Sequence, residues 1–180
     1  MKRILGFDIS SSCIGWCVLE INEDNNIKFI KCDNLKPSKK GSILDKLLDT
    51  KSKIQKIIEE EKPDYIGIED LIKFMPKSTA TTVVTLASFN RMIGMLSYEY
   101  LNDHPGLFNV MSIRHALKLN KNLPKKEEMP ELVSKHLGIK FPYIKDKKGK
   151  IKSESFDMAD GIAVALYYSF ILTNRIKIKK

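Results

Sequence analysis

The sequence is poor in the residues that build zinc sites and nucleophilic triads. Of its 180 residues, only three are cysteine and three are histidine. Cys13, Cys17 and Cys32 lack the paired Cys or Cys/His spacing of a zinc site, which argues against that class. Their odd number instead indicates buried free thiols in a reducing compartment. The histidines are scattered, and no Ser–His–Asp or Cys–His arrangement is evident.

Long hydrophobic runs are missing as well. The longest weakly charged stretch, residues 78–98, contains Thr, Ser, Asn and Arg91 and is too polar for a membrane span. A strand is predicted from residue 3, which leaves no room for a signal or transit peptide. We therefore expect a cytoplasmic protein without membrane contact. No internal repeat is evident, so residues 1–180 are predicted to form a single domain with a basic tail at 175–180.

Positive charge is what the chain has in excess. Lys and Arg number 31 against 22 Asp and Glu, which gives a formal net charge of +9. The lysines gather in four segments, residues 36–40, 118–126, 145–152 and 175–180. Solubility alone would explain a basic balance, but this uneven placement favours a polyphosphate partner such as nucleic acid.

The order of predicted elements indicates an α/β fold. Segments rich in Ile, Val, Phe, Trp and Cys, separated by turn compositions, predict an antiparallel three-strand meander over residues 3–9, 14–20 and 27–32. An amphipathic helix over 43–61, ended by Pro63, precedes a strand at 64–69. The remaining expected elements are a helix at 79–101, a strand at 107–111, helices at 113–119 and 130–137, a mobile lysine-rich loop at 141–154, and a final helix at 156–173 capped by Ser155.

This order resembles the ribonuclease H-like fold. The resemblance implies a central mixed five-stranded sheet, three antiparallel strands followed by parallel strands, flanked by helices. In that arrangement the first and fourth strands are parallel neighbours, about 4.8 Å apart. Asp8 and Glu69, which end these two strands, would then lie side by side.

Four carboxylates carry most of the functional information: Asp8, Glu69, Asp157 and Asp160. Asp157 and Asp160 lie three residues apart at the start of the last helix and share a face. Alone, this pair would be read as first-turn caps, but an acid at a buried strand end is costly unless it is paired or binds a cation. Together the four acids predict a site for Mg²⁺, with Mn²⁺ as a substitute. Two such ions, about 3.5–4 Å apart, can flank a scissile phosphate.

The segments around these acids resemble a known family. They read Asp-Ile-Ser-Ser-Ser-Cys-Ile-Gly-Trp at 8–16, Ile-Gly-Ile-Glu at 66–69 and Asp-Met-Ala-Asp-Gly-Ile-Ala-Val-Ala-Leu at 157–166. In this order and spacing they are similar to the RuvC family of Holliday-junction resolvases. That family more often has Pro-Gly after its first Asp, where this chain has Ile9 and Ser10. The resemblance implies a Mg²⁺-dependent endonuclease that cuts four-way DNA junctions with paired symmetric nicks, with the four acids as catalytic and metal-binding residues.

The same resemblance implies DNA contacts and a dimer. Lys121 and Lys126, with Lys125 beside them, match the offsets of family lysines that contact DNA near the active site, although a solvated lysine loop is the alternative. Phe74, between Lys73 and Lys77, is the candidate aromatic that stacks on bases at the junction centre, and an ordinary core role for it stays open. RuvC proteins dimerise along the helix that corresponds to residues 79–101, whose apolar residues lie on more than one side.

Three other functions remain open. Another ribonuclease H-like nuclease, acting on RNA–DNA hybrids or on flap and branched DNA, would share the site chemistry. A non-catalytic junction-binding protein would share the fold, although the presence of all four acids argues against it. The start at Asp8 also resembles the phosphate loop of actin-like ATPases and sugar kinases, but these need two such domains and 180 residues leave no space for the second.

Overall fold

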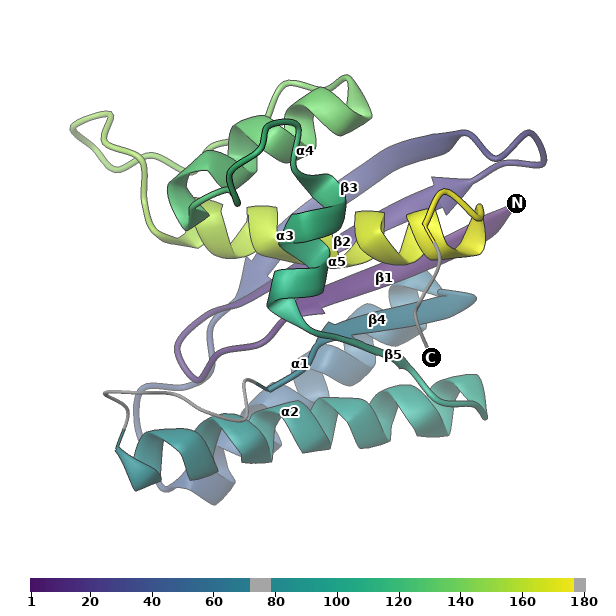
Figure 1. The fold of residues 1–180 in the computed structure, drawn as a ribbon. Coiled ribbons are helices and arrows are strands. Elements are labelled where there is room, and N and C mark those ends of the chain that lie inside the picture. The colour runs from purple at the N-terminus through teal and green to yellow at the C-terminus, as the bar shows by residue number, and fades with distance from the viewer. Residues whose placement is uncertain (72–78, 177–180) are drawn as a thin grey trace.

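A five-stranded mixed sheet forms the centre of the computed structural model, which describes residues 1–71 and 79–176 (Figure 1). The strands are β1 (Lys2–Asp8), β2 (Ile14–Ile21), β3 (Ile27–Leu35), β4 (Tyr65–Glu69) and β5 (Gly106–Phe108), in the order β3-β2-β1-β4-β5. The first three form an antiparallel meander, and β4 and β5 add to it in parallel. This confirms the predicted ribonuclease H-like sheet. The fifth strand is shorter than the predicted 107–111, because a helix already begins at Val110.

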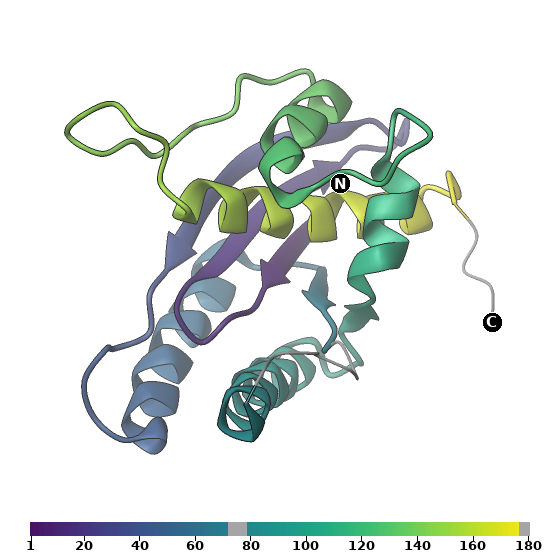
Figure 2. The same ribbon diagram turned by 60° about the vertical axis from the view of Figure 1, so that its left-hand side comes forward.

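Helices cover both faces of the sheet. Figures 1 and 2 show α1 (Ile43–Glu61) and α2 (Ala80–Leu101) on one face. The other face carries α3 (Val110–Leu117), α4 (Met129–Leu137) and α5 (Glu154–Leu172), with a short 3₁₀ helix, η1 (Lys126–Glu128), leading into α4. Side chains alternate between the two faces of the strands and so contribute to two separate hydrophobic cores. Leu5 and Phe7 pack toward α1 and α2, whereas Ile4 packs toward α5.

The helix α1 has clear start and stop signals. Ser42 and Asp45 form a capping box, in which the Ser42 hydroxyl accepts from the Asp45 backbone N–H and the Asp45 carboxylate accepts from the Ser42 backbone N–H. At the other end Lys62 adopts a left-handed conformation with φ of 47°, and Pro63 follows it. The helix therefore ends where the sequence predicts.

The last helix, α5, begins two residues earlier than predicted, and the assignment of Ser155 as its cap is wrong. The helix starts at Glu154 with Ser153 at the N-cap position. The Ser155 side chain is buried and bonds instead to the backbone of Ile144, accepting from its N–H at 2.9 Å and donating to its carbonyl at 3.2 Å. A tertiary partner has therefore replaced the local one.

The same helix packs unusually close to the sheet. A Cβ atom placed on Gly6 would lie 2.5 Å from the backbone N of Ala165, and one on Gly15 would lie 1.8 Å from the carbonyl oxygen of Asp157. Glycine is needed at both positions because only backbone fits there. By length and composition α5 could also cross a membrane. Most of it is buried against β1 and β2 here, as expected of a core helix.

Within the segment 141–154, predicted to be a mobile loop, residues 144–152 form a hairpin. An antiparallel backbone bridge joins Lys145 and Ile151, and Gly149 supplies the left-handed residue of the turn with φ of 80°. The hairpin projects from the body of the fold next to the start of α5 (Figures 1 and 2).

The three cysteines are free, as the sequence predicts. Cys13 and Cys17 are buried, and Cys32 is partly buried directly opposite Cys17 on the neighbouring strand. Burial raises the pKa of the Cys13 and Cys32 thiols to about 12 and that of Cys17 well above its usual range. Thiols in such surroundings are chemically inert.

Candidate active site

The ends of two neighbouring parallel strands bring Asp8 and Glu69 together. In the register of β1 and β4, Phe7 is opposite Ile68, so the next pair along the strands is Asp8 and Glu69. Ile66 and Ile68 point into the core beneath α1 and α2. Because side chains alternate along a strand, Glu69 faces the α5 side. Asp8 faces that side too, since Leu5 and Phe7 take the opposite one.

The close packing of α5 supplies the other two acids. Gly15 is the partner of Asp8 on β2, and the backbone of Asp157 crosses directly over it. Gly161 on α5 faces Gly15 in return, because a Cβ atom there would lie 2.8 Å from the Gly15 carbonyl carbon. This glycine contact places the first two turns of α5, and with them Asp157 and Asp160, over the ends of β1 and β4.

Burial and mutual repulsion make the ionised forms of these acids energetically unfavourable. Asp8 and Asp160 are only 9% and 7% exposed to solvent. Burial, followed by the charges of Glu69 and Asp160, raises the pKa of Asp8 well above its usual range. Burial and the Asp160 charge likewise raise the pKa of Glu69 to about 7. Burial also raises the pKa of Asp160. Carboxylates in such a place favour any cation that can reach them.

Lys126 is the cation that reaches them in this structure. Its ammonium donates a hydrogen bond to Oδ1 of Asp157 at 2.7 Å and lies 3.3 Å from Oδ2 of Asp160. Burial opposes the charge of Lys126, but the Asp157 hydrogen bond and the charges of Asp160 and Asp8 outweigh it, so the pKa of Lys126 is raised. Lys126 was predicted as a DNA contact, and the structure brings it to the carboxylates themselves.

Arg114 adds a second positive charge to the site. It lies on α3, and its guanidinium lowers the pKa values of Glu69 and Asp160, partly offsetting their burial. Its Nε is buried and has no hydrogen-bond partner among residues 1–71 and 79–176. The sequence gives little sign of this role, because Arg114 belongs to a short helix forty-five residues after Glu69.

The chemistry of this donor set fits a hard divalent cation. Four carboxylates supply only oxygen ligands, which Mg²⁺ and Mn²⁺ prefer. Across residues 1–71 and 79–176, however, no three His, Cys, Asp or Glu side chains converge into a group already shaped to hold a metal ion. The positive charge between Asp157 and Asp160 is that of the Lys126 ammonium. The four acids are close enough for their charges to interact, and the Lys126 ammonium pairs with two of them.

Glu69 is also held from the α2 side. The side-chain amide of Asn90, a buried residue of α2, donates to the carbonyl oxygen of Glu69 at 2.9 Å. The neighbouring Asp70 faces the same helix, where its carboxylate lies 3.6 Å from the guanidinium of Arg91. Asp70 therefore has a charged partner outside the group of acids.

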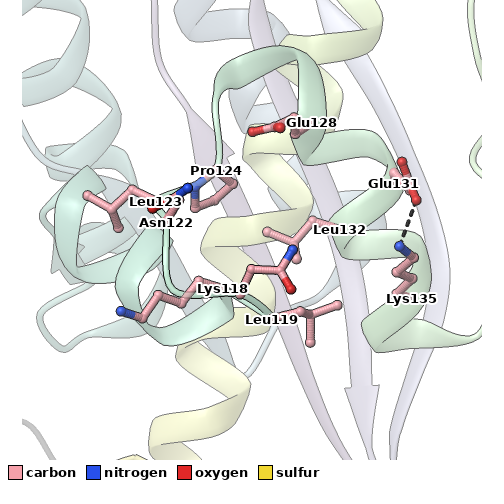
Figure 3. A pocket seen from close by; sticks show the side chains of 10 residues that line it. Lys118, Leu119, Asn122, Leu123, Pro124, Glu128, Glu131, Leu132 and Lys135 are labelled. Atoms are coloured by element: carbon pink, nitrogen blue, oxygen red, sulfur yellow. Dashed lines mark ion pairs between the residues drawn. The ribbon is translucent and has the colours of Figure 1, made fainter.

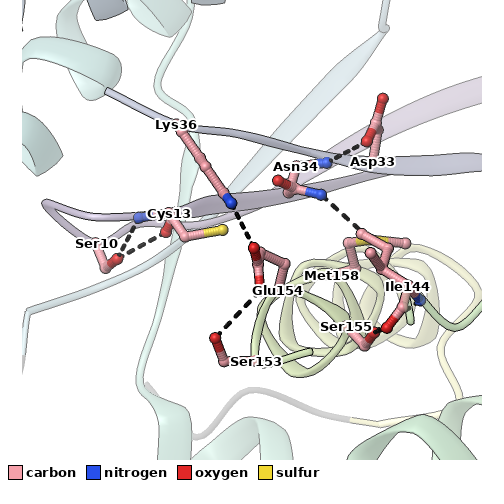
Figure 4. A network of polar contacts seen from close by, with 10 residues as sticks. All are labelled: Ser10, Cys13, Asp33, Asn34, Lys36, Ile144, Ser153, Glu154, Ser155 and Met158. Carbon is pink, nitrogen blue, oxygen red and sulfur yellow. Dashed lines mark hydrogen bonds and ion pairs between the residues drawn. The ribbon is translucent and has the colours of Figure 1, made fainter. Parts of the chain in front are cut away.

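A polar network borders the site on the β1–β2 side (Figure 4). The Ser10 hydroxyl accepts from the backbone N–H of Cys13 at 3.0 Å and donates to its carbonyl at 2.7 Å. This side chain closes the turn after Asp8, at the point where the chain departs from the Pro-Gly of the family. Lys36 forms an ion pair with Glu154 at the start of α5. The Lys36–Glu154 pair joins residues far apart in the sequence and is not evident from local patterns.

The predicted DNA-binding lysines fall in different places. Lys121 and Lys125 are exposed on the segment between α3 and α4. Beside this segment is a hollow of about 320 Å³, lined by Lys118, Leu119, Asn120, Asn122, Leu123, Pro124, Glu128, Glu131, Leu132 and Lys135 (Figure 3). Phe74, Lys73 and Lys77 lie outside the described residues.

No protein-family model matches the chain, but curated proteins and solved structures do. The chain is 25% identical over 165 residues to crossover junction endodeoxyribonuclease RuvC of Finegoldia magna, covering 81% of this chain and 99% of that one. It is 25% identical over 163 residues to the RuvC of Prochlorococcus marinus, covering 91% and 95%. The structure of Thermus thermophilus RuvC in complex with a Holliday junction superposes with a TM-score of 0.73 at 15% identity, covering 97% of this chain and 96% of that one.

Proposed function

We propose that this chain, a member of the RuvC family by sequence and by fold, is a structure-selective DNA endonuclease that resolves four-way junctions. The reaction is hydrolysis of phosphodiester bonds, with paired symmetric nicks. One observation carries the proposal: three elements far apart in the sequence, β1, β4 and α5, deliver four carboxylates to one edge of the sheet beneath basic side chains.

The four acids would hold the catalytic metal, which we propose to be Mg²⁺ at two positions, with Mn²⁺ able to substitute. When bound, such ions activate a water and stabilise the leaving oxygen. The chain contributes rigidity, because strand ends and a tightly packed helix fix Asp8, Glu69, Asp157 and Asp160. Lys126 and Arg114 contribute positive charge, which lowers the electrostatic cost of bringing a phosphate to a site with four acids.

DNA binding is proposed to use the lysines next to the site. Lys121 and Lys125 are exposed within a few residues of Lys126, which itself contacts the acids. A strand whose phosphate enters the site would therefore pass these side chains. Phe74, with Lys73 and Lys77, stays the predicted base-stacking segment, and its position after Glu69 in the sequence is suitable for that role.

We also propose that the protein works as a homodimer through α2. Several apolar side chains of this helix are exposed in the single chain, and Val84 and Met95 are 65% and 64% exposed. A two-fold dimer provides two equivalent sites for the two strands of a junction that must be cut. Analytical ultracentrifugation would measure this directly, and a monomer at micromolar concentration would contradict it.

Cleavage of synthetic DNA tests the function. A labelled four-way junction, a linear duplex and an RNA–DNA hybrid of the same sequence would each be incubated with Mg²⁺ or with EDTA. We expect paired nicks on the junction alone, and only with Mg²⁺. Cutting of the hybrid instead would move the function to a ribonuclease H, and tight junction binding without cleavage under any divalent metal would indicate a non-catalytic protein.

The cellular location of the protein is also part of the proposal. Free thiols fit the cytoplasm, a reducing compartment, and we propose this location. We propose that the protein binds DNA in solution and has no membrane partner.

A further inference from the structure

The hairpin next to α5 concentrates positive charge that the fold does not use. Between residues 140 and 152 there are six lysines and one acid, Asp146. All six lysines are exposed: Lys140, Lys145, Lys147, Lys148, Lys150 and Lys152. Among the described residues, none of them forms an ion pair, whereas Lys36, Lys53, Lys126 and Lys135 each have an acidic partner.

The one acid of the hairpin is occupied by the turn. The Asp146 carboxylate accepts from the backbone N–H groups of Lys148 at 2.8 Å and Lys150 at 2.9 Å. The Asp146 backbone N–H also donates to the Lys150 carbonyl at 2.9 Å. These bonds organise the tip and leave the ammonium groups of Lys147, Lys148 and Lys150 without local compensation. The tip thus carries a cluster of exposed positive charge on a hydrogen-bonded turn.

The base of the hairpin is fixed to the catalytic helix. Ser155 bonds both the N–H and the carbonyl of Ile144, and it lies two residues before Asp157 (Figure 4). Phe141, at the entry to the hairpin, is buried in the core beneath α5. The lysines therefore keep a defined position relative to the carboxylates, as a binding element requires.

We propose that this lysine hairpin, residues 144–152, binds the phosphate backbone of the duplex arm that leaves the active site. The inference rests on the proposed function, since it takes the junction as the ligand. Lys148 at the tip is four residues along the chain from Ile144, which at about 3.3 Å per residue gives a reach of up to about 13 Å. At 3.4 Å per base pair this is roughly four base pairs of the arm. Duplex DNA presents the dense negative charge that an uncompensated lysine cluster favours.

The test compares two triple variants with equal loss of charge. One changes Lys147, Lys148 and Lys150 to Gln at the hairpin tip. Its control changes Lys28, Lys51 and Lys56, exposed on β3 and α1, to Gln. Junction affinity would be measured in EDTA at several salt concentrations, so that binding is observed without cleavage. Circular dichroism and the melting temperature would show that both variants are folded.

Each lost phosphate contact lowers the slope of log K against log salt by about 0.9. We expect the tip variant to lose about 2 to 3 in slope and on the order of 10²-fold in affinity at 0.1 M salt. The control should stay close to the unmodified protein. Cleavage of saturating junction should change little in the tip variant, because the carboxylates are intact.

An unchanged affinity and slope in the tip variant, or an equal loss in the control, would overturn the hairpin proposal. Failure of the proposed function gives a different pattern. If the unmodified protein binds junctions but cuts none with any divalent metal, the nuclease assignment fails while the comparison of slopes still decides the role of the hairpin. If it binds no DNA at all, both proposals are rejected.

Discussion

Replacing Gly15 with alanine should disable the site without touching any carboxylate. The new Cβ would lie 1.8 Å from the carbonyl oxygen of Asp157, 2.3 Å from its carbonyl carbon and 2.8 Å from the N of Met158. These are backbone atoms of α5, so no flexible side chain can move aside. A relaxed contact between carbon and oxygen needs about 3.3 Å, and the start of α5 must therefore retreat by about 1.5 Å.

That displacement sets the expected magnitudes. A misplacement of about 1 Å in a catalytic group costs on the order of 10²-fold in rate, so Gly15→Ala should lower junction cleavage at saturating substrate by at least that factor. Overpacking of this kind should also lower the free energy of unfolding by about 1–3 kcal/mol. Cleavage would be followed in single-turnover reactions, and stability in urea by circular dichroism.

Gly94 provides the matched control for stability. It lies inside α2, and a Cβ atom there would meet no atom of the described part of the chain within 4 Å. Gly94→Ala should therefore raise the free energy of unfolding by about 0.5–1 kcal/mol, as expected for an unobstructed helix interior. Wild-type cleavage and unchanged stability in Gly15→Ala would refute the close contact between β2 and α5.

Four further results are expected. Asp160→Asn should abolish cleavage, leave junction affinity within a few-fold, and raise the melting temperature of the metal-free protein, because one repelling buried charge is removed. The pKa of Glu69 is raised to about 7 from the ordinary value of 4.5, so the folded state holds this proton more tightly than the unfolded chain does. The free energy of unfolding of the metal-free protein should therefore increase by up to about 3 kcal/mol as pH falls from 8 to 5. Mn²⁺ should reverse this trend in urea titrations. Lys126→Met should lower the melting temperature of the metal-free protein and enlarge the increase in melting temperature that Mn²⁺ causes. If Mn²⁺ raises the melting temperature equally in both proteins, the ammonium does not compete with the metal. Val84→Glu should convert the dimer to a monomer in ultracentrifugation and reduce paired nicking, whereas a persistent dimer would place the interface elsewhere.

The sheet could be predicted because its signals are local. Alternating apolar residues and turn compositions define each strand, whereas the parallel pairing of β1 with β4 is expected from the resemblance of their order to the ribonuclease H-like fold. The neighbourhood of Asp8 and Glu69 is a direct consequence of that pairing. The gathering of Asp157 and Asp160 with them depended on the resemblance to a family, since nothing local shows where the last helix packs.

Long-range partners account for what could not be predicted. Ser155 has the local sequence of a helix cap, but its hydroxyl is taken by Ile144 in the preceding hairpin. The site position of Lys126 depends on the path of the chain between α3 and α4, and no periodicity defines that path. The hairpin itself is held by Asp146, whose carboxylate bonds two backbone groups of a segment that composition alone describes as a flexible lysine-rich loop.

The three thiols, two buried and one partly buried, make the unmodified chain a convenient background for site-directed labelling. With pKa values of about 12, Cys13 and Cys32 carry about 10⁻⁵ thiolate at pH 7, and Cys17 lies deeper still. A cysteine introduced at an exposed position has a pKa near 8.5, which gives about 3% thiolate and an advantage of about three orders of magnitude toward maleimides. A fluorophore or spin label could thus be attached at one chosen point without first removing the native cysteines.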